Sequence, residues 1–112
     1  MSLRARYAPW FDADFHFRTA WYAEHGGSEL AERFVDAVER TVKKLTRNPH
    51  LGPGPYPKDS DLGELHFVLI ERPFHKHILF YRFNQEALFL ERLIHGARDL
   101  PRRVKESPYE ID

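Results

Sequence analysis

A run of prolines and glycines divides the chain into two halves of different character. Between Asn48 and Asp61 the sequence contains four prolines and two glycines, a composition that interrupts helices and strands and is typical of an ordered surface loop. The residues before this loop have helical periodicity, and the residues after it are rich in β-branched and aromatic side chains. A chain of 112 residues forms one hydrophobic core, so both halves are expected to share a single α+β domain.

The half before the loop predicts two helices joined by a glycine pair. Residues 9–24 begin with a proline and carry two aspartates in the first turns, where negative charge complements the helix dipole. Residues 28–47 repeat apolar side chains at helical spacing, with acids at the start and basic residues at the end. Ser28 is the expected N-cap. The pair Gly26-Gly27 lets the chain reverse, which predicts a helical hairpin.

Four segments predict strands. Residues 3–8 alternate apolar and basic side chains, as a short strand with one buried face would. Residues 64–70, 77–83 and 87–95 are β-branched and aromatic runs separated by short turn signals, which predicts three sequential antiparallel strands. The predicted order is therefore β-α-α-β-β-β, a helical hairpin packed on a small antiparallel sheet.

The domain is expected to span residues 1–104, followed by a polar tail at 105–112, and the segment after Pro101 is polar enough to be loosely held. No apolar run approaches the roughly 18 residues of a membrane-spanning helix, and the first residues lack the pattern of a secretory signal. The sequence contains no cysteine, so nothing requires an oxidising compartment. A soluble, cytoplasmic protein is the expectation.

Several chemistries do not fit the sequence. Seventeen basic residues balance seventeen acidic ones, so no global positive field gathers nucleic acid. The segment 52–55 has prolines where a phosphate-binding loop needs N–H donors. His66, His75 and His77 invite a metal site, but no carboxylate ligand accompanies them and Lys76 adds repulsion. We expect no metal and no organic cofactor.

The end of the last strand carries the most reactive group of side chains. His95 and Arg98 flank a glycine turn at one end of the sheet, a setting in which an imidazole can move a proton while arginines hold a phosphate. The alternative is a surface network of ion pairs, Arg98 with Asp99 or Arg92 with Glu91, which needs no activity.

Five motifs together resemble the RelE/ParE toxins of bacterial type II toxin–antitoxin modules, over about residues 3–104. They are WYAE at 21–24, LAERF at 30–34, NPHLG at 48–52, HILFYR at 77–82 and LIHGARD at 93–99. The family fold, a helical hairpin on a small antiparallel sheet, agrees with the order deduced from periodicity. The resemblance also implies a role in plasmid stabilisation and a toxin–antitoxin hetero-oligomer.

The family contains two activities, and fold alone does not separate them. RelE-like members cut mRNA on the ribosome, whereas ParE-like members poison DNA gyrase. The resemblance implies that RelE-like nucleases are strongly basic and carry an arginine where this chain has Ile78. Together with the zero net charge, this favours a ParE-like gyrase inhibitor. A RelE-like endoribonuclease, or an inactive relic that only binds antitoxin, remains the alternative.

Two sets of residues follow from this interpretation. His95, Arg98 and Arg82 are the residues expected to matter for activity, and they would be catalytic in a nuclease. The first helix has wider apolar coverage than a two-layer domain hides, so an antitoxin is expected to cover part of it. The residues expected to contact the antitoxin are Phe11, Phe15, Phe17, Trp21 and Tyr22.

Overall fold

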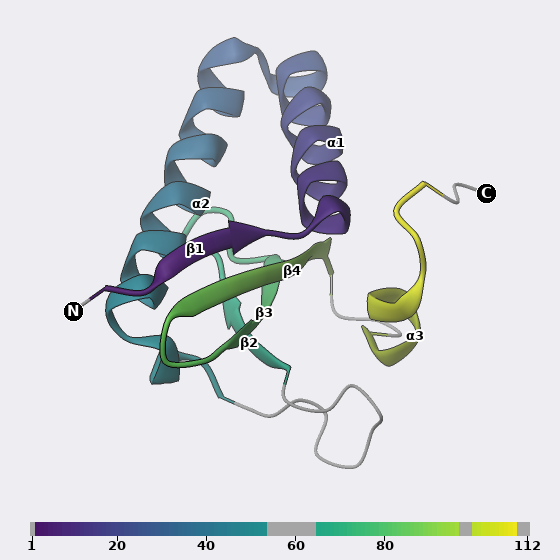
Figure 1. Ribbon diagram of the computed structural model, residues 1–112. Coiled ribbons are helices and arrows are strands. Elements are labelled where there is room, and N and C mark those ends of the chain that lie inside the picture. The colour runs from purple at the N-terminus through teal and green to yellow at the C-terminus, as the bar shows by residue number, and fades with distance from the viewer. Residues whose placement is uncertain (1, 54–64, 97–99, 110–112) are drawn as a thin grey trace.

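The structure is a computed structural model that describes residues 2–53, 65–96 and 100–109. Figure 1 shows the elements in chain order, with the two long helices side by side above the sheet. The elements are β1 (Arg4–Tyr7), α1 (Pro9–Gly26), α2 (Ser28–Arg47), the 3₁₀ turn η1 (Pro49–Leu51), β2 (His66–Leu69), β3 (His77–Phe83), β4 (Ala87–His95) and α3 (Leu100–Lys105). The predicted order of strands and helices is confirmed up to β4, and α3 is an addition to it.

The two long helices form the predicted hairpin. Gly27 separates them with a φ of 91°, a left-handed conformation that residues with a Cβ rarely adopt. The N-cap of α2 is Gly27, and Ser28, the expected N-cap, is instead the first residue of the helix. Most apolar residues of α2 repeat at helical spacing and are buried, including Phe34 and Leu45 with no exposed surface.

The sheet has four strands in the order β1-β4-β3-β2. The three strands after the loop pair antiparallel, as predicted, with His66 opposite Tyr81 and His77 opposite His95. β1 runs parallel to β4, so the sheet is mixed rather than wholly antiparallel. Two parallel neighbouring strands need a long crossover connection. The helical hairpin forms part of the connection between β1 and β4.

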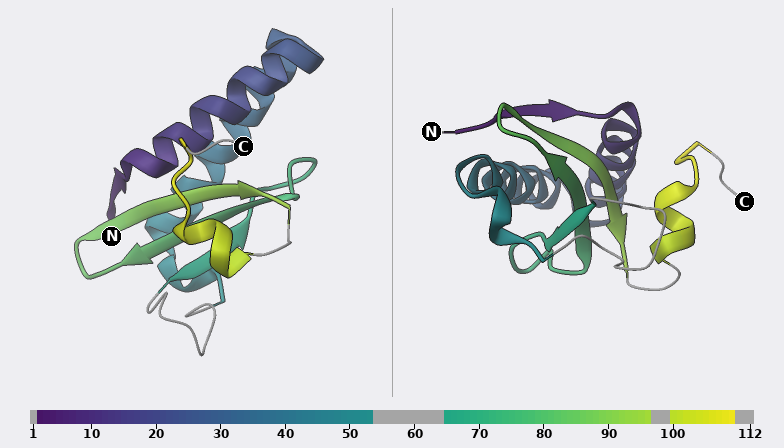
Figure 2. Two further views of the ribbon diagram at one scale, coloured as in Figure 1. Left: turned by 90° about the vertical axis from the view of Figure 1, so that its right-hand side faces the viewer. Right: turned by 60° about the horizontal axis from the view of Figure 1, so that its bottom comes forward.

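Helices cover both faces of the sheet. The two further views show α1 and α2 on one side and α3 on the other (Figure 2). The hairpin face, the side covered by α1 and α2, carries the larger core, which includes Phe11, Phe34, Leu45 and Tyr81. The α3 face carries a second cluster, formed by Leu65, Ile78, Phe80, Ile94 and Val104. The polar segment after residue 101 was expected to be loosely held, but it forms most of α3 because Val104 is buried against the sheet.

One tyrosine ties the start of the proline-rich loop to the sheet. The Tyr81 hydroxyl donates a hydrogen bond of 2.7 Å to the Pro49 carbonyl and accepts one of 3.1 Å from the Gly52 amide. A Cβ added to Gly52 would lie 2.1 Å from the Phe67 carbonyl oxygen, so only glycine fits this approach. These contacts explain why the NPHLG and HILFYR motifs occur together. Among the described residues, no helix is long and apolar enough to cross a membrane.

Candidate functional site

His95 lies at the end of β4, directly opposite His77 of β3. The two imidazole rings have centroids 4.7 Å apart. His77 is buried on the hairpin face, and its Nε2 shares a hydrogen bond of 2.8 Å with the hydroxyl of Tyr22 from α1. The two strands and α1 thus bring two histidines and a tyrosine together; His77 is buried, whereas Tyr22 and His95 are partly exposed.

Both histidines are held in the neutral form. Burial lowers the pKa of His77 to about 3, with smaller contributions from His95 and Arg18. Burial also lowers the pKa of His95, followed by the positive charges of Arg18, Lys76 and Arg103. A neutral imidazole can accept a proton from a substrate but adds no positive charge to a binding site.

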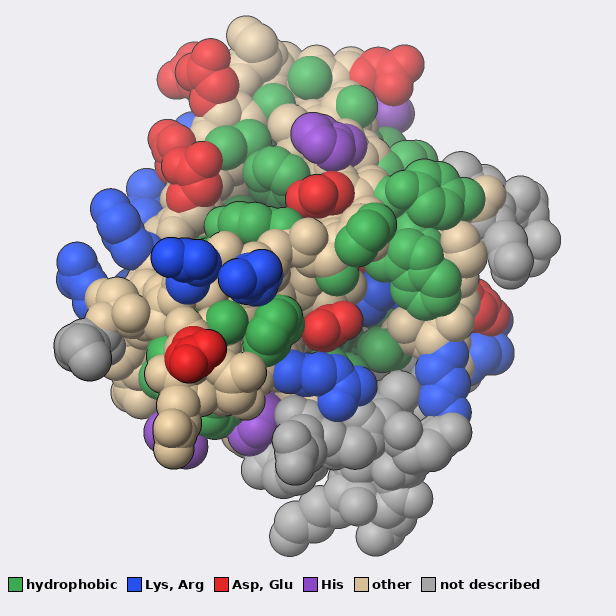
Figure 3. Space-filling view, in the orientation of Figure 1, with side chains coloured by type: hydrophobic (Ala, Val, Ile, Leu, Met, Phe, Trp, Pro, Cys, Tyr) green, Lys and Arg blue, Asp and Glu red, His purple; other side chains and the backbone are tan. Residues whose placement is uncertain are grey.

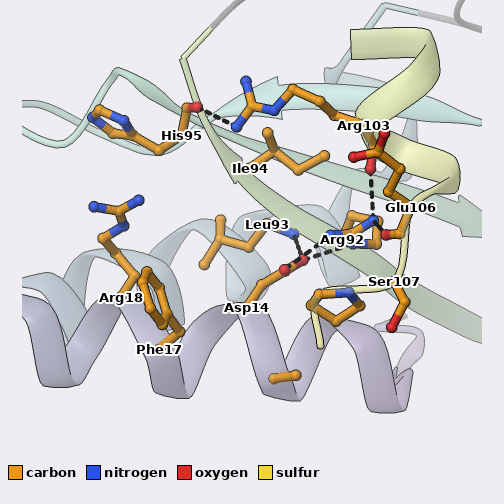
Figure 4. A pocket seen from close by; sticks show the side chains of 12 residues that line it. Asp14, Phe17, Arg18, Arg92, Leu93, Ile94, His95, Arg103, Glu106 and Ser107 are labelled. Carbon is orange, nitrogen blue, oxygen red and sulfur yellow. Dashed lines mark hydrogen bonds and ion pairs between the residues drawn. The ribbon is translucent and has the colours of Figure 1, made fainter. Parts of the chain in front are cut away.

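Beside His95 a cleft opens between α1, the end of β4 and α3. We call it the α1–α3 cleft; its volume is about 200 Å³. The close view in Figure 4 shows the guanidinium of Arg18 rising from α1 toward His95, with Arg103 of α3 reaching the same strand end from the other side. Arg103 donates a hydrogen bond of 2.6 Å to the His95 carbonyl. The cleft is lined by Ala13, Asp14, Phe17, Arg18, Arg92, Leu93, Ile94, His95, Arg103, Glu106, Ser107 and Pro108.

A buried arginine forms the structural base of this cleft. Arg92 is 6% exposed, and its Nε and Nη2 donate hydrogen bonds of 2.8 and 3.0 Å to the two carboxylate oxygens of Asp14. Its Nη1 donates to the carbonyls of Arg103, Val104 and Glu106 at 2.8, 2.9 and 2.6 Å, which fixes the end of α3. The alternative of a surface pair between Arg92 and Glu91 is therefore wrong. The partner comes from α1, a position that sequence neighbourhood does not reveal.

The residues expected to carry activity are not all brought together. Arg82 lies opposite Phe89 in the strand register, whereas His95 lies opposite His77. Five residues of strand, roughly 17 Å, separate these two positions of β3. Arg82 instead lines a different cavity, near Trp10 and Val104. Arg98 lies outside the described residues.

Two residues of the cleft were not predicted from the sequence. Arg18 and Arg103 lie on different helices, 85 positions apart, and each modifies the electrostatics of His95. One signal was available for Arg18, because Phe17 and Trp21 place aromatic rings one and three positions away on a helix. No comparable signal pointed to Arg103.

The residues expected to contact an antitoxin divide between two sides of α1. Phe11 and Phe15 line a groove of about 270 Å³ between α1 and α2, the hairpin groove, although Phe11 is only 1% exposed and forms its floor. Tyr22 points into the core toward His77. Trp21 and Phe17 are 39% and 55% exposed, so they are available to a partner.

Hydrophobic side chains gather between the two helices on the face seen in Figure 3, with acidic and histidine side chains among them. The hairpin groove lies in this region, and it is lined by Tyr7, Phe11, Asp12, Phe15, His16, Val38, Glu39 and Val42. Its apolar floor and polar edges are the pattern that an amphipathic helix fits. In the described parts of the chain, no group of three or more histidine or acidic side chains could hold a metal ion.

This arrangement of a helical hairpin on a four-stranded mixed sheet is similar in fold to a solved toxin–antitoxin structure. That structure is described as the chromosomal ParDE TA system from P. aeruginosa; the TM-score is 0.69, and the match covers 86% of this chain and 98% of the other at 18% identity. The family described as ParE toxin of type II toxin-antitoxin system, parDE, matches residues 6–100. The chain therefore belongs to the ParE toxin family. None of the curated proteins compared with it is significantly similar in sequence.

Proposed function

We propose that this chain is the toxin of a type II toxin–antitoxin pair, that it acts in the cytoplasm by inhibiting DNA gyrase, and that a cognate antitoxin neutralises it in a hetero-oligomer. Membership of the ParE toxin family supports the module type. The target is inferred from the chemistry of the sheet, and the antitoxin surface from the hairpin groove.

The observation that carries the choice of target is the burial of Ile78. RelE-like nucleases are expected to carry an arginine at this strand position, where it would hold RNA phosphate. Here Ile78 is 6% exposed and packs under α3 with Val104. An apolar side chain beneath a helix offers neither charge nor access to a phosphate, so this face of the sheet lacks a central element of a ribonuclease site.

Net charge supports the same choice. The chain carries no net charge at neutral pH, counting histidine as neutral, and affinity for RNA depends on neutralising phosphates with lysine and arginine. Gyrase is a protein target, whose recognition relies on shape and on local polar contacts.

The antitoxin surface rests on the hairpin groove. Phe11, Phe15, Val38 and Val42 give it an apolar floor, and Asp12 and Glu39 give it charged edges. An amphipathic antitoxin helix would place its apolar stripe on that floor. Occlusion of α1 would then neutralise any target surface on the same helix.

Supercoiling assays with purified DNA gyrase test the target. We expect the free chain to block supercoiling, and the same amount of chain bound to its antitoxin to have no effect. A parallel incubation with ribosomes and mRNA is the control. Unchanged supercoiling together with ribosome-dependent mRNA cleavage would overturn the gyrase proposal and favour the nuclease. Inactivity in both assays with retained antitoxin binding would identify a relic.

The nuclease alternative can be tested at one residue, His95. His95 is a neutral imidazole beside Arg18 and Arg103, so it could accept the proton of a ribose hydroxyl. For a nuclease, His95→Gln should abolish growth arrest, because an amide cannot carry a proton at neutral pH. For a gyrase inhibitor, Arg98→Ala should reduce growth arrest more than His95→Gln does. Full toxicity of the triple variant Arg82→Ala, His95→Gln, Arg98→Ala would place the active surface elsewhere, most plainly on the hairpin.

A further inference from the structure

Arg18 is a half-buried cation held in a fixed orientation. It lies on the side of α1 that faces the α1–α3 cleft. Its guanidinium carbon lies 5.6 Å from the ring centroid of Phe17 and 5.3 Å from that of Trp21. Stacking on two aromatic rings orients the planar fork of an arginine before any ligand arrives.

This guanidinium has no counter-charge in the described parts of the chain. Two carboxylates line the same cleft, but each is already engaged. Asp14 accepts hydrogen bonds from Arg92 and from the Leu93 amide, and Glu106 pairs with Arg102. Arg18 thus carries a positive charge that its neighbours do not balance.

Burial and neighbouring positive charges make the unbalanced charge of Arg18 less favourable. Burial is the largest cause that lowers the pKa of Arg18; the neighbouring Tyr22 raises it, and the charge of Arg103 lowers it. Lys76 adds a third positive charge that acts on His95 from the turn before β3. Like charges gathered at a small opening destabilise one another, and a bound anion would relieve the repulsion.

We infer that the α1–α3 cleft binds a carboxylate side chain from an acidic, otherwise apolar segment of the antitoxin, with the Arg18 guanidinium as its principal partner. This inference rests on the proposed function, because it names a chemical feature of the partner that the function requires. The hairpin groove lies on the other side of α1 from the cleft, so a segment that crosses α1 would contact both.

The lining of the cleft favours a single carboxylate on a peptide over an extended polyanion. Leu93, Ile94 and Pro108 add apolar surface, and Phe17 is exposed at its edge. The carboxylates of Asp14 and Glu106 also line the cleft and would repel a chain of phosphates. A lone acidic side chain between apolar neighbours carries one charge, which meets the guanidinium with less of that repulsion.

Binding measurements on the toxin–antitoxin complex test the inference. The probe is the antitoxin encoded beside the toxin gene, titrated against the wild-type chain, Arg18→Gln and the control Arg33→Gln, an exposed arginine on α2. A charge-assisted hydrogen bond predicts a loss of ~10- to 100-fold in affinity for Arg18→Gln and a weaker dependence on salt. Arg33→Gln should change the affinity less than about twofold.

The two proposals fail in different ways. Absence of binding by the wild-type chain would overturn the antitoxin partnership itself. Tight wild-type binding with equal affinities for Arg18→Gln and Arg33→Gln would leave the partnership intact and overturn the assignment of the cleft. Arg18→Gln should melt at the wild-type temperature, because it removes no ion pair.

Replacing each antitoxin acid by its amide tests the carboxylate without altering the toxin fold. Replacement of one acidic residue should lower the affinity of the complex to a similar extent. Combining that replacement with Arg18→Gln should lower the affinity little further. Strictly additive losses at every acid would overturn the inference. As an independent readout, the pKa of His95, followed by NMR of its ring protons, should rise in free Arg18→Gln, which removes a positive charge, and in the wild-type complex, where the bound carboxylate adds a negative one. An unchanged titration in both would contradict the proposed geometry.

Discussion

The two faces of the sheet are stabilised by different interactions. On the hairpin face, aromatic and aliphatic side chains from α1, α2 and the strands form one continuous core. Phe34, with no exposed surface, has ring centroids within 6.0 Å of Phe15, Tyr22, Phe74 and His77. On the α3 face, a small apolar cluster is supplemented by Arg92, which bonds to Asp14 of α1 and to three carbonyls at the end of α3.

The difference predicts how a substitution on each face affects stability. Apolar burial is spread over many contacts, so the hairpin face should lose stability in proportion to the surface removed. The α3 face depends on the several hydrogen bonds of one side chain, so a single substitution should release α3 while the rest of the fold persists. The cleft lies beside this second face, and its shape therefore depends on Arg92.

The largest effect is expected at the centre of the hairpin face. Phe34→Ala removes a fully buried ring and should lower the free energy of unfolding by about 3–5 kcal/mol. Chemical denaturation measures the loss. Phe17→Ala, at a ring that is 55% exposed, is the matched control and should change stability by less than about 0.5 kcal/mol. Equal losses for the two variants would contradict the placement of the core.

Arg92→Met should cost slightly less, about 3 kcal/mol, because it leaves the Asp14 carboxylate buried without its partner. Its effect should be local. Hydrogen exchange at the amides of residues 104–106 should accelerate strongly, while the amides of α2 keep their protection.

The double variant Arg92→Met, Asp14→Asn is the control for this interpretation. It removes the unpaired buried charge of Asp14 and should recover part of the lost stability. It should not restore the protection of the α3 amides against hydrogen exchange. Exchange that accelerates equally in α2 and α3 would show that the two faces unfold as one unit.

Tyr81→Phe should cost about 2 kcal/mol, because it leaves the Pro49 carbonyl and the Gly52 amide without their buried partner. The ring itself stays, so the hairpin-face core is kept and only the attachment of the loop is lost. Tyr109→Phe, at a side chain that is 68% exposed, is the control and should be neutral. A neutral Tyr81→Phe would mean that water replaces the hydroxyl.

The smallest effect, taken per pH unit, is a dependence of stability on pH that arises from His77. Its pKa falls from 6.5 to about 3 on folding, mainly through burial. Below pH 6.5 the unfolded chain therefore binds a proton that the folded chain does not, and stability falls as the pH falls. The slope should approach about 1.4 kcal/mol per pH unit from this group alone.

Stability curves from pH 7 to pH 4 measure this effect as the difference between the wild-type chain and His77→Gln. The glutamine variant should show a shallower decline, since it removes the titrating group but retains an amide for the Tyr22 hydroxyl. Parallel curves for the two proteins would show that His77 is not held neutral in the hairpin-face core.

Local patterns in the sequence determined the helices and strands. The boundaries of β3 and β4 agree with those predicted, because alternating and aromatic runs bounded by turn residues carry their own signal. The hairpin was equally predictable, since α2 combines helical periodicity with charges suited to its dipole. The motifs shared with the toxin family added the module type, which no physical pattern encodes.

Only the tertiary structure decided which residues meet. The sequence indicated His95 as part of a candidate site, but Arg18 and Arg103 reach it from α1 and α3, and Asp14 is brought to Arg92 across 78 positions. The tertiary structure also separated Arg82 from His95 and gave β1 its parallel direction. The physical reason is that periodicity records which side of an element is apolar, whereas long-range charge pairing depends on how packed elements are placed in space.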